Sequence, residues 1–313
     1  MHPDFAVRGK ILARYAVQEL GYRTLAVLSS TEPNGAAVAE SFSSEARRLG
    51  GHIIAAESFP RQASDIRQQC MSIRRSALDA HPTISFAKRP SASEMEKFVR
   101  AGVERKRIDS LVSIGGNIAV TELLGPRGIA IADSLRIKLS SPTTESENLN
   151  EPITSIDAIF VGIDDAEEIG VIGSQLSYFN IKSQILGNNE WYDPDHLDAQ
   201  RQYINGIIFA SDTFIDPTDP AYIDFVNAYR RGGGKQSTKY TLIGYDVAKL
   251  VLACLGTGIG NRNALNEALF KTHGYKGVHS SVTLTRGRVN SRMHILQYSK
   301  GEVRKIGETT LND

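Results

Sequence analysis

The chain has 313 residues, with 36 Lys and Arg against 35 Asp and Glu, so its formal net charge is +1. This balance gives no overall electrostatic reason to bind nucleic acid or an anionic membrane. An apolar content of 41% is typical of a globular protein and excludes disorder as the main state. No apolar run approaches the roughly 18 residues of a membrane helix. The start, Met1-His2-Pro3-Asp4, lacks the basic and apolar segments of a signal peptide.

Motifs for catalysis, metal binding and cofactor binding are missing from the sequence. Cys70 and Cys254 form no zinc or redox motif and are too few for a disulfide scaffold, so we interpret them as two ordinary buried thiols. No two histidines have the i, i+4 spacing of a helical zinc site, and there is no Gly-x-Ser-x-Gly elbow. We therefore expect no catalytic residues, no metal and no cofactor, and a protein that is not an enzyme.

Short apolar runs alternate with helical stripes along most of the chain. One stripe, with Val38 and Phe42, lies between the first two runs. This alternation predicts an α/β fold with a doubly wound, mostly parallel sheet. The strands are expected at residues 24–29, 52–58, 157–163, 184–187 and 206–211. Near the end of the chain, alternating apolar residues with turns at Arg286-Gly287-Arg288 and Lys300-Gly301 predict a C-terminal β-hairpin.

Residues 76–152 break this rhythm and are predicted to be an insertion. The segment contains one clear helical pattern, Ser93 to Glu104, and two runs that we interpret as strands, Ser110 to Ile114 and Leu135 to Leu139. Its polar end, Ser140 to Asn148, is expected to be a protease-sensitive loop. The insertion should pack at the edge of the sheet or away from it.

Small and polar residues follow several of the predicted strands. Ligands of an open parallel sheet bind beyond the carboxyl ends of its strands. Hydroxyls, amides and helix N-termini at such ends suit a small polar or zwitterionic ligand. Trp191 either forms a wall of this site or packs in the core. The candidate ligand-binding residues from these strand ends are Ser29, Ser30, Thr31, Asn34, Gly35, Asp164, Asn189, Glu190 and Trp191.

Two clusters of charge each allow two interpretations. Asp164-Asp165 and Glu167-Glu168 could bind a cation or an ammonium group, but helix N-terminal acids that complement the helix dipole are the simpler interpretation. Basic residues between Arg61 and Arg107 could face an anionic partner. A solvated helix surface is the simpler account here, because acidic residues are interleaved with them.

Five segments, in this order, resemble one protein family: "GKILARYAVQELGYRTLAVL" at 9–28, "NGAAVAESFSSEARRLGGHIIAAESF" at 34–59, "IDAIFVGIDDAEEIGVIGSQLSYFNIKSQILGNNEWYDPDHL" at 156–197, "INGIIFASDTF" at 204–214 and "GYDVAKLVLACL" at 244–255. They resemble the type I periplasmic solute-binding proteins, specifically the leucine/isoleucine/valine-binding branch of ABC transporters. The resemblance implies two lobes that close over a ligand.

By this resemblance the chain starts where the second lobe starts and lacks the N-terminal half of the first lobe. The second lobe would comprise residues 1–75, 153–223 and 276–313, with 76–152 as the insertion. Residues 224–275, with helices expected at Tyr245 to Leu255 and Asn263 to Lys271, would belong to an incomplete first lobe. A second copy of the chain, in a homodimer, could cover the apolar faces of these helices.

The resemblance also implies site residues and a role. Ser29 to Gly35 would form the first cleft loop, with Asn34 where the family often has an aromatic residue. Asn189, with Glu190 beside it, stands near the acid that amino-acid binders use for the ligand's ammonium group. Tyr245 and Asp246 match the hinge-proximal start of a helix.

The implied role is that of the substrate-binding component of a branched-chain amino acid ABC transporter, periplasmic or extracellular, with an ABC permease as partner. The alternative is a solute-free regulatory or scaffolding module of the same superfamily that binds a protein partner.

Overall fold

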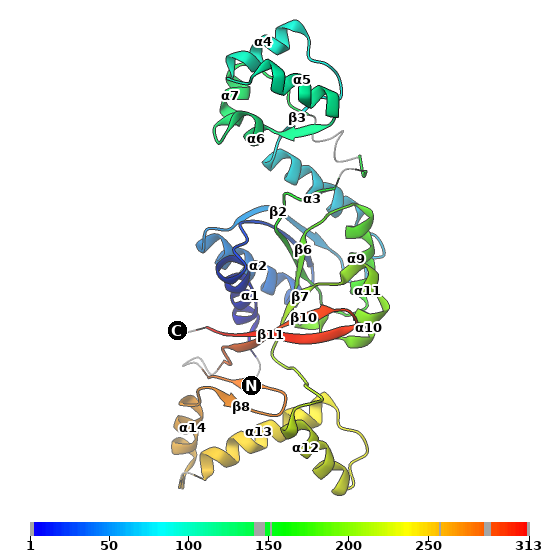
Figure 1. The fold of residues 1–313 in the computed structure, drawn as a ribbon. Coiled ribbons are helices and arrows are strands. Elements are labelled where there is room, and N and C mark those ends of the chain that lie inside the picture. Colours follow the sequence, from blue (N-terminus) through cyan, green and yellow to red (C-terminus); the bar gives the residue numbers. More distant parts are fainter. Residues whose placement is uncertain (1–2, 141–147, 151, 257, 285–288, 312–313) are drawn as a thin grey trace.

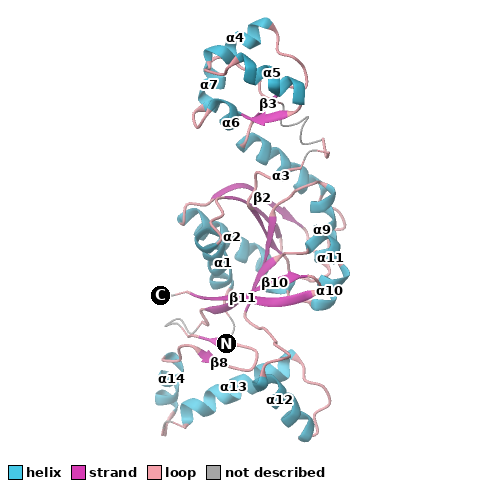
Figure 2. Cartoon of the chain, viewed as in Figure 1, coloured by secondary structure: helices cyan, strands magenta, loops and turns pink. Residues whose placement is uncertain are grey.

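The computed structural model describes residues 3–140, 148–150, 152–256, 258–284 and 289–311, and these form three stacked units (Figures 1 and 2). The central unit contains the main sheet. A small module built from residues 83–140 lies beyond the C-terminal end of α3, and a helical unit built from residues 216–284 lies on the opposite side. In the described part of the chain, no helix is both long enough and apolar enough to cross a membrane.

The central unit is a sheet between two helical layers. Its elements are α1 (Phe5–Arg14), the π-helical turn η1 (Tyr15–Glu19), β1 (Thr24–Ser30), α2 (Pro33–Arg48), β2 (His52–Phe59), α3 (Arg67–Ala80), β5 (Ala158–Gly162), α9 (Glu168–Tyr178), β6 (Gln184–Gly187), the 3₁₀ turn η2 (Asn189–Trp191), α10 (Pro194–Ala199), α11 (Arg201–Ile204), β7 (Ile208–Ser211), β10 (Arg292–Ser299) and β11 (Glu302–Thr310).

The seven strands are ordered β11-β10-β7-β6-β5-β1-β2. The five from β7 to β2 are parallel, while β10 is antiparallel to both β7 and β11. All five strands expected from the sequence lie in this sheet, so the prediction of a mostly parallel α/β fold is confirmed. The C-terminal hairpin is confirmed at Lys300-Gly301, where both residues have a positive φ as a tight hairpin turn requires. The expected turn at Arg286–Arg288 lies outside the described residues.

Each face of the sheet buries its own apolar core. On one face α1 and α2 pack against the strands, and the rings of Phe42 and Phe160 stack with centroids 4.6 Å apart. On the other face α3, α9, α10 and α11 cover the strands, with Ile73, Ile172 and Leu197 in the core. β1, β5 and β7 are buried on both faces, which explains why their sequences are continuous apolar runs.

The module of residues 83–140 has a separate core around Phe86, Phe98 and Ile108. Its elements are β3 (Thr83–Ser85), α4 (Ala92–Arg100), α5 (Arg105–Ile114), β4 (Asn117–Ala119), α6 (Val120–Leu124) and α7 (Gly128–Ser134), with β3 and β4 antiparallel.

Two strand predictions in this region are wrong. Ser110 to Ile114 is the C-terminal half of α5, and Leu135 to Leu139 follows α7 without strand pairing. Both are short apolar runs, which periodicity alone does not assign to strand or helix. The helix expected at Ser93 to Glu104 is present as α4 but ends at Arg100. Of the loop expected at Ser140 to Asn148, residues 141–147 lie outside the described part of the chain.

The unit of residues 216–284 buries few side chains. It contains α12 (Pro220–Arg231), α13 (Lys239–Leu255), α14 (Arg262–Phe270), β8 (Tyr275–Lys276) and β9 (Ser281–Val282). α13 begins before the expected Tyr245 because Thr238 and Thr241 form a capping box there. Thr213, which follows the last parallel strand, pairs with Ser280 of this unit.

Candidate functional site

The carboxyl ends of β1, β5, β6 and β7 lie along the same edge of the sheet, because these strands are parallel and adjacent. Polar residues follow each of the four strands at this edge. We call it the strand-end edge and define it by Ser30, Gly35, Asp164, Asn189 and Asp212.

Asp164 connects the end of β5 to the start of α2. Its Oδ1 accepts a hydrogen bond of 3.2 Å from the backbone N–H of Gly35, so the carboxylate caps a neighbouring helix at the positive end of its dipole. A Cβ at position 35 would lie 2.8 Å from Asp164 Oδ2 and 3.3 Å from the carbonyl oxygen of Gly162. Glycine therefore permits the close approach. Oδ2 of Asp164 is buried and has no hydrogen-bond partner among the described residues.

Asn188 joins the loops after β5 and β6. Its side chain accepts a hydrogen bond from the Ile163 N–H at 3.2 Å and donates one to the Ile163 carbonyl at 2.7 Å. The residue is buried, so this pair satisfies backbone groups that water does not reach. Asn188 and Ile163, which directly precede Asn189 and Asp164, therefore hold these two residues at a fixed spacing.

Asn189 already has partners within the chain. Its Oδ1 accepts a hydrogen bond from Arg8 Nη1, and its Nδ2 donates to Glu190 Oε1 at 2.6 Å. Arg8, whose side chain is 13% exposed, also lies 3.8 Å from Asp212 Oδ2 and donates to the Pro3 carbonyl at 3.1 Å. The guanidinium thus bridges the residues that follow β6 and β7.

The acidic residues after β5, Asp164 to Glu168, make contacts at the start of α9 and with the loops beside it. Glu168 is buried and accepts hydrogen bonds from the N–H groups of Gln62 and Asp164, both at 3.2 Å. Burial, the largest influence, raises the pKa of Glu168. Asp165 pairs with Arg61 at 3.6 Å. Within the described ranges, no group of three or more His, Cys, Asp or Glu side chains has the geometry to hold a metal ion.

The remaining residues expected at the edge differ in accessibility. Ser29 and Ser30 are buried at the end of β1, and Ser30 Oγ accepts a hydrogen bond from the Glu32 N–H at 3.1 Å. Thr31 and Asn34 are exposed at the start of α2. Trp191 is completely buried in the core, and its indole N–H donates to the Val161 carbonyl at 3.0 Å. Of the two interpretations of Trp191, the structure supports core packing.

Tyr245 and Asp246 lie on α13, outside the strand-end edge. Asp246 is completely buried and accepts hydrogen bonds from the N–H of Val278 at 2.7 Å, from His279 Nδ1 at 2.7 Å and from Ser280 Oγ at 2.7 Å. These hydrogen bonds lower the pKa of Asp246 against the opposing effect of burial, which is the largest single influence. Tyr245 packs on the Phe225 ring, with centroids 4.8 Å apart. Both residues therefore shape the helical unit.

Sequence reasoning missed Arg8 and Asp212. Arg8 lies in α1, and the signal for this helix is Asp4, whose side chain caps it by accepting a hydrogen bond of 2.7 Å from the Val7 N–H. Asp212 directly follows β7, so applying the strand-end rule to the fifth strand would have found it.

Comparisons with known proteins identify the fold. No family model matches the sequence, and no curated protein matches it. Among solved structures, the chain is similar to a protein of Rhodospirillum rubrum described as a branched-chain amino acid ABC transporter. The TM-score is 0.59 at 17% identity, over 94% of this chain and 63% of that one.

Two further structures agree with this match. The leucine-binding protein of Thermotoga maritima gives a TM-score of 0.54 at 14% identity, over 97% of this chain and 65% of that one. A type 1 periplasmic binding protein of Bordetella pertussis gives 0.51 at 12% identity, over 96% and 65%. The fold is that of the type I periplasmic binding proteins. The chain spans less than two thirds of each of these three proteins.

Proposed function

We propose that this chain is a non-enzymatic solute-binding protein that holds a small amino-acid-like ligand at its strand-end edge. The similar proteins are described as a branched-chain amino acid ABC transporter and as a leucine-binding protein, which supports this class of solute. In this proposal the chain is the substrate-binding component of an ABC transporter, it works in the periplasm or outside the cell, and an ABC permease is its partner.

The observation that carries the proposal is the carboxylate of Asp164. One of its oxygens caps α2, while the other is buried without a hydrogen-bond donor among the described residues. A carboxylate oxygen in that position is costly unless it is paired, and the ammonium group of an amino acid would supply the donors. Pro33 has no N–H, and the N–H groups of Thr31 and Gly35 are already donated within the chain. The start of α2 therefore offers the backbone N–H of Asn34 and the positive end of the helix dipole for the ligand's carboxylate.

The proposal assigns the units to lobes. Residues 1–75, 153–223 and 276–313, which contain the strands of the central sheet, act as the second lobe, and residues 224–275 belong to the first lobe. A ligand between two complete lobes is desolvated and bound from both sides. A ligand on the strand-end edge alone stays mostly solvated, so we expect a Kd on the order of 1 mM, or about −4 kcal/mol.

Calorimetric titration of the 313-residue chain with each of the twenty amino acids tests the proposal. We expect weak binding of one or more aliphatic amino acids, and a loss of at least tenfold in Asp164→Asn, which keeps the cap on α2 but removes the charge. Asp165→Asn is the matched control because Asp165 pairs with Arg61. Micromolar binding would show that the site is complete in this chain. Equal binding by the Asp164 and Asp165 variants would exclude the strand-end edge.

A second candidate is the solute-free regulatory or scaffolding module. It is favoured by Asn189, whose amide is already engaged by Arg8 and Glu190, and by the apolar side chains that α13 exposes. In that case the chain would bind no amino acid even at tens of millimolar, and a protein partner or a second copy would cover α13.

A further inference from the structure

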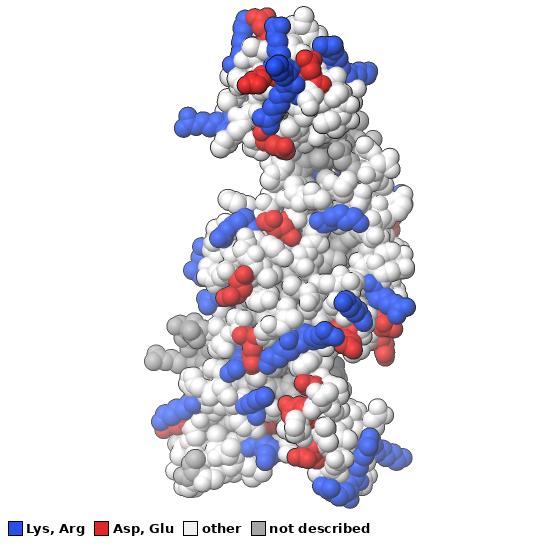
Figure 3. All heavy atoms as spheres, viewed as in Figure 1, with Lys and Arg blue, Asp and Glu red and all other residues white. Residues whose placement is uncertain are grey.

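The module of residues 83–140 differs in charge from the rest of the chain. It contains ten Lys and Arg and six Asp and Glu, a net charge of +4, whereas the whole chain carries +1. Figure 3 shows Lys and Arg side chains over much of the visible face of this module, with Asp and Glu among them. The positive charge is therefore concentrated in the unit that also has its own apolar core.

A cavity of about 660 Å³ opens in this module. Two chain segments form its sides, one after β3 and one after α7, and the Ser140 N–H donates to the Thr83 carbonyl at 2.9 Å where they meet. Its walls combine two kinds of side chain. The apolar ones are Ile84, Phe98, Ile137 and Leu139, and the cationic ones are Lys88, Arg89, Lys97 and Lys138.

The four cations differ in how far they are already engaged. Lys97 donates to the Arg136 carbonyl at 2.7 Å, and Arg89 pairs with Asp109 at 3.0 Å. Lys88 and Lys138 are exposed, and neither makes a hydrogen bond or close ion pair within the described ranges. These two ammonium groups are therefore available to an anion.

Glu94 is the single carboxylate in the lining and offsets one of the four cationic charges. Its side chain accepts two hydrogen bonds of 2.8 Å from Ser91, one from the N–H and one from the hydroxyl, within the capping box of α4. These bonds, with smaller contributions from the charges of Lys97 and Lys138, lower the pKa of Glu94, so it is ionised at neutral pH. The cavity keeps an excess of positive charge.

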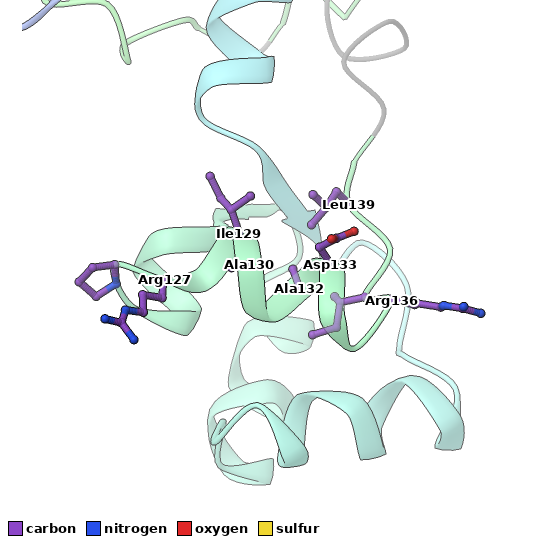
Figure 4. Close-up of a pocket in the computed structure, with 9 residues that line it drawn as sticks. Arg127, Ile129, Ala130, Ala132, Asp133, Arg136 and Leu139 are labelled. Carbon is purple, nitrogen blue, oxygen red and sulfur yellow. The ribbon is translucent and has the colours of Figure 1, made fainter.

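The apolar lining continues into a second cavity of about 850 Å³, which shares Ile137 and Leu139 with the first. In Figure 4, Arg127 and Arg136 point to opposite sides of α7, whereas Ile129 and Leu139 lie on the side nearer to β3. Residues 137–139 thus form a common wall with apolar surface on both sides. A ligand with an apolar body longer than the first cavity would find further apolar contacts here.

We propose that the cavity between β3, α4 and residues 137–140 binds a small amphiphilic anion. Lys88 and Lys138 hold its phosphate or carboxylate group, and its apolar body packs against Ile137 and Leu139. A single-stranded nucleic acid does not fit, because bases stack on exposed aromatic rings and Phe98 is buried in the module's core. This site is separate from the strand-end edge, and the proposal is independent of solute binding there.

Calorimetry with octyl phosphate below its micelle concentration tests the proposal. Counting its non-hydrogen atoms, we expect a Kd on the order of 100 µM that weakens as salt is added. Octyl glucoside, which lacks the charge, and inorganic phosphate, which lacks the apolar body, should each bind at least tenfold more weakly. Equal affinity for octyl phosphate and octyl glucoside would overturn the role of the cations.

The variants locate the site. Lys88→Ala with Lys138→Ala should weaken octyl phosphate binding at least tenfold, while Lys106→Ala, an exposed lysine of α5 outside the cavity, should leave it unchanged. Circular dichroism should show the same melting temperature for all three proteins. Unchanged binding in the double variant, or no binding of octyl phosphate to the unmodified chain, would refute the proposal.

The same anionic group is present in free amphiphiles and in lipid headgroups. Flotation with vesicles of phosphatidylglycerol, compared with phosphatidylcholine, distinguishes these sources. Flotation with phosphatidylglycerol that the double variant loses would identify a lipid headgroup. Binding of octyl phosphate without flotation would identify a soluble amphiphile.

Discussion

Asn188 controls the geometry of the strand-end edge more than the candidate binding residues do. Replacing it with alanine leaves both the N–H and the carbonyl of Ile163 buried without partners. We expect Asn188→Ala to lower the free energy of unfolding by about 2–4 kcal/mol. Urea denaturation measures this, with the exposed Asn34→Ala as control, which should change stability by less than about 0.5 kcal/mol. If Asn188→Ala lowered the free energy of unfolding no more than Asn34→Ala, the hydrogen bonds of Asn188 would not be what holds the two loops together.

His294 on β10 makes stability depend on pH. The residue is 5% exposed, and burial lowers its pKa from 6.5 to about 4, helped by Lys305 and Arg292 against the opposing charges of Glu308 and Asp212. As the pH falls below 6.5, the unfolded chain takes up a proton that the folded chain does not. Stability is therefore fully present above pH 6.5 and is lost progressively down to about pH 4.

The pH dependence can be measured between pH 7 and pH 5, above the range where carboxylates titrate strongly. We expect His294 to account for a loss of about 2 kcal/mol over this interval. His294→Gln should have a shallower slope, and His52→Gln, an exposed histidine of β2, should keep the slope of the unmodified chain. Parallel slopes for all three proteins would contradict the assignment.

At the residue scale, the sequence predicted the strand-end edge but not its internal partners. The rule that ligands bind at strand ends correctly located Asp164 and Asn189 at one edge. It did not show that Arg8 engages Asn189, because that contact joins residues far apart in the sequence. Trp191 allowed two interpretations because it lies in a polar stretch of sequence, which does not show that its side chain points into the core and donates to the Val161 carbonyl.

Among the elements, α13 combines an anchored side with an exposed apolar side. Leu250 is 4% exposed, whereas Leu252 is 61% exposed on the same helix. We expect Leu250→Ala to destabilise the helical unit by about 2–4 kcal/mol and Leu252→Ala to have little effect. Hydrogen exchange of the α13 amides, followed by mass spectrometry, distinguishes the two variants. Equal protection in both would mean that α13 is packed differently.

The exposed apolar side of α13 also bears on self-association. If two copies cover it in a homodimer, Leu252→Lys should shift the chain to monomer in sedimentation velocity at concentrations where the unmodified chain is dimeric. Lys249→Ala, on the side of α13 that faces the cavity with Tyr245, serves as control. If the unmodified chain and both variants were all monomeric, a homodimer through the exposed side of α13 would be excluded.

At the element scale, the sequence predicted the long and strongly patterned elements. β1, β5 and β7 carry continuous apolar runs because both of their faces are buried, whereas β2 lies at the edge of the sheet and is partly exposed. The errors fall in residues 83–140, where elements are short and a run such as Ser110 to Ile114 has too few residues to show a period. The sequence pattern breaks after residue 75, but α3 continues to Ala80 and contributes Ala77 to the central core. The start of the predicted insertion therefore overlaps the end of a helix that covers the sheet.

On the scale of the whole molecule, three units with different amounts of core are joined in one chain. The central sheet has a core on each face, the module of residues 83–140 has one small core, and the unit of residues 216–284 buries few side chains. The general fold followed from alternating apolar runs, because that pattern is repeated over many elements. The cavities of the small module did not, because they depend on how short segments pack.

Binding of an amino-acid-like solute should involve residues of the strand-end edge directly. The most direct measurement is an NMR titration of the ¹⁵N-labelled chain with leucine, which reports on each backbone amide. We predict shifts that saturate with a Kd on the order of 1 mM and that are centred on Thr31, Gly35 and Asp164. Shifts confined to α13 or to residues 83–140, or no shifts with any of the twenty amino acids, would contradict it.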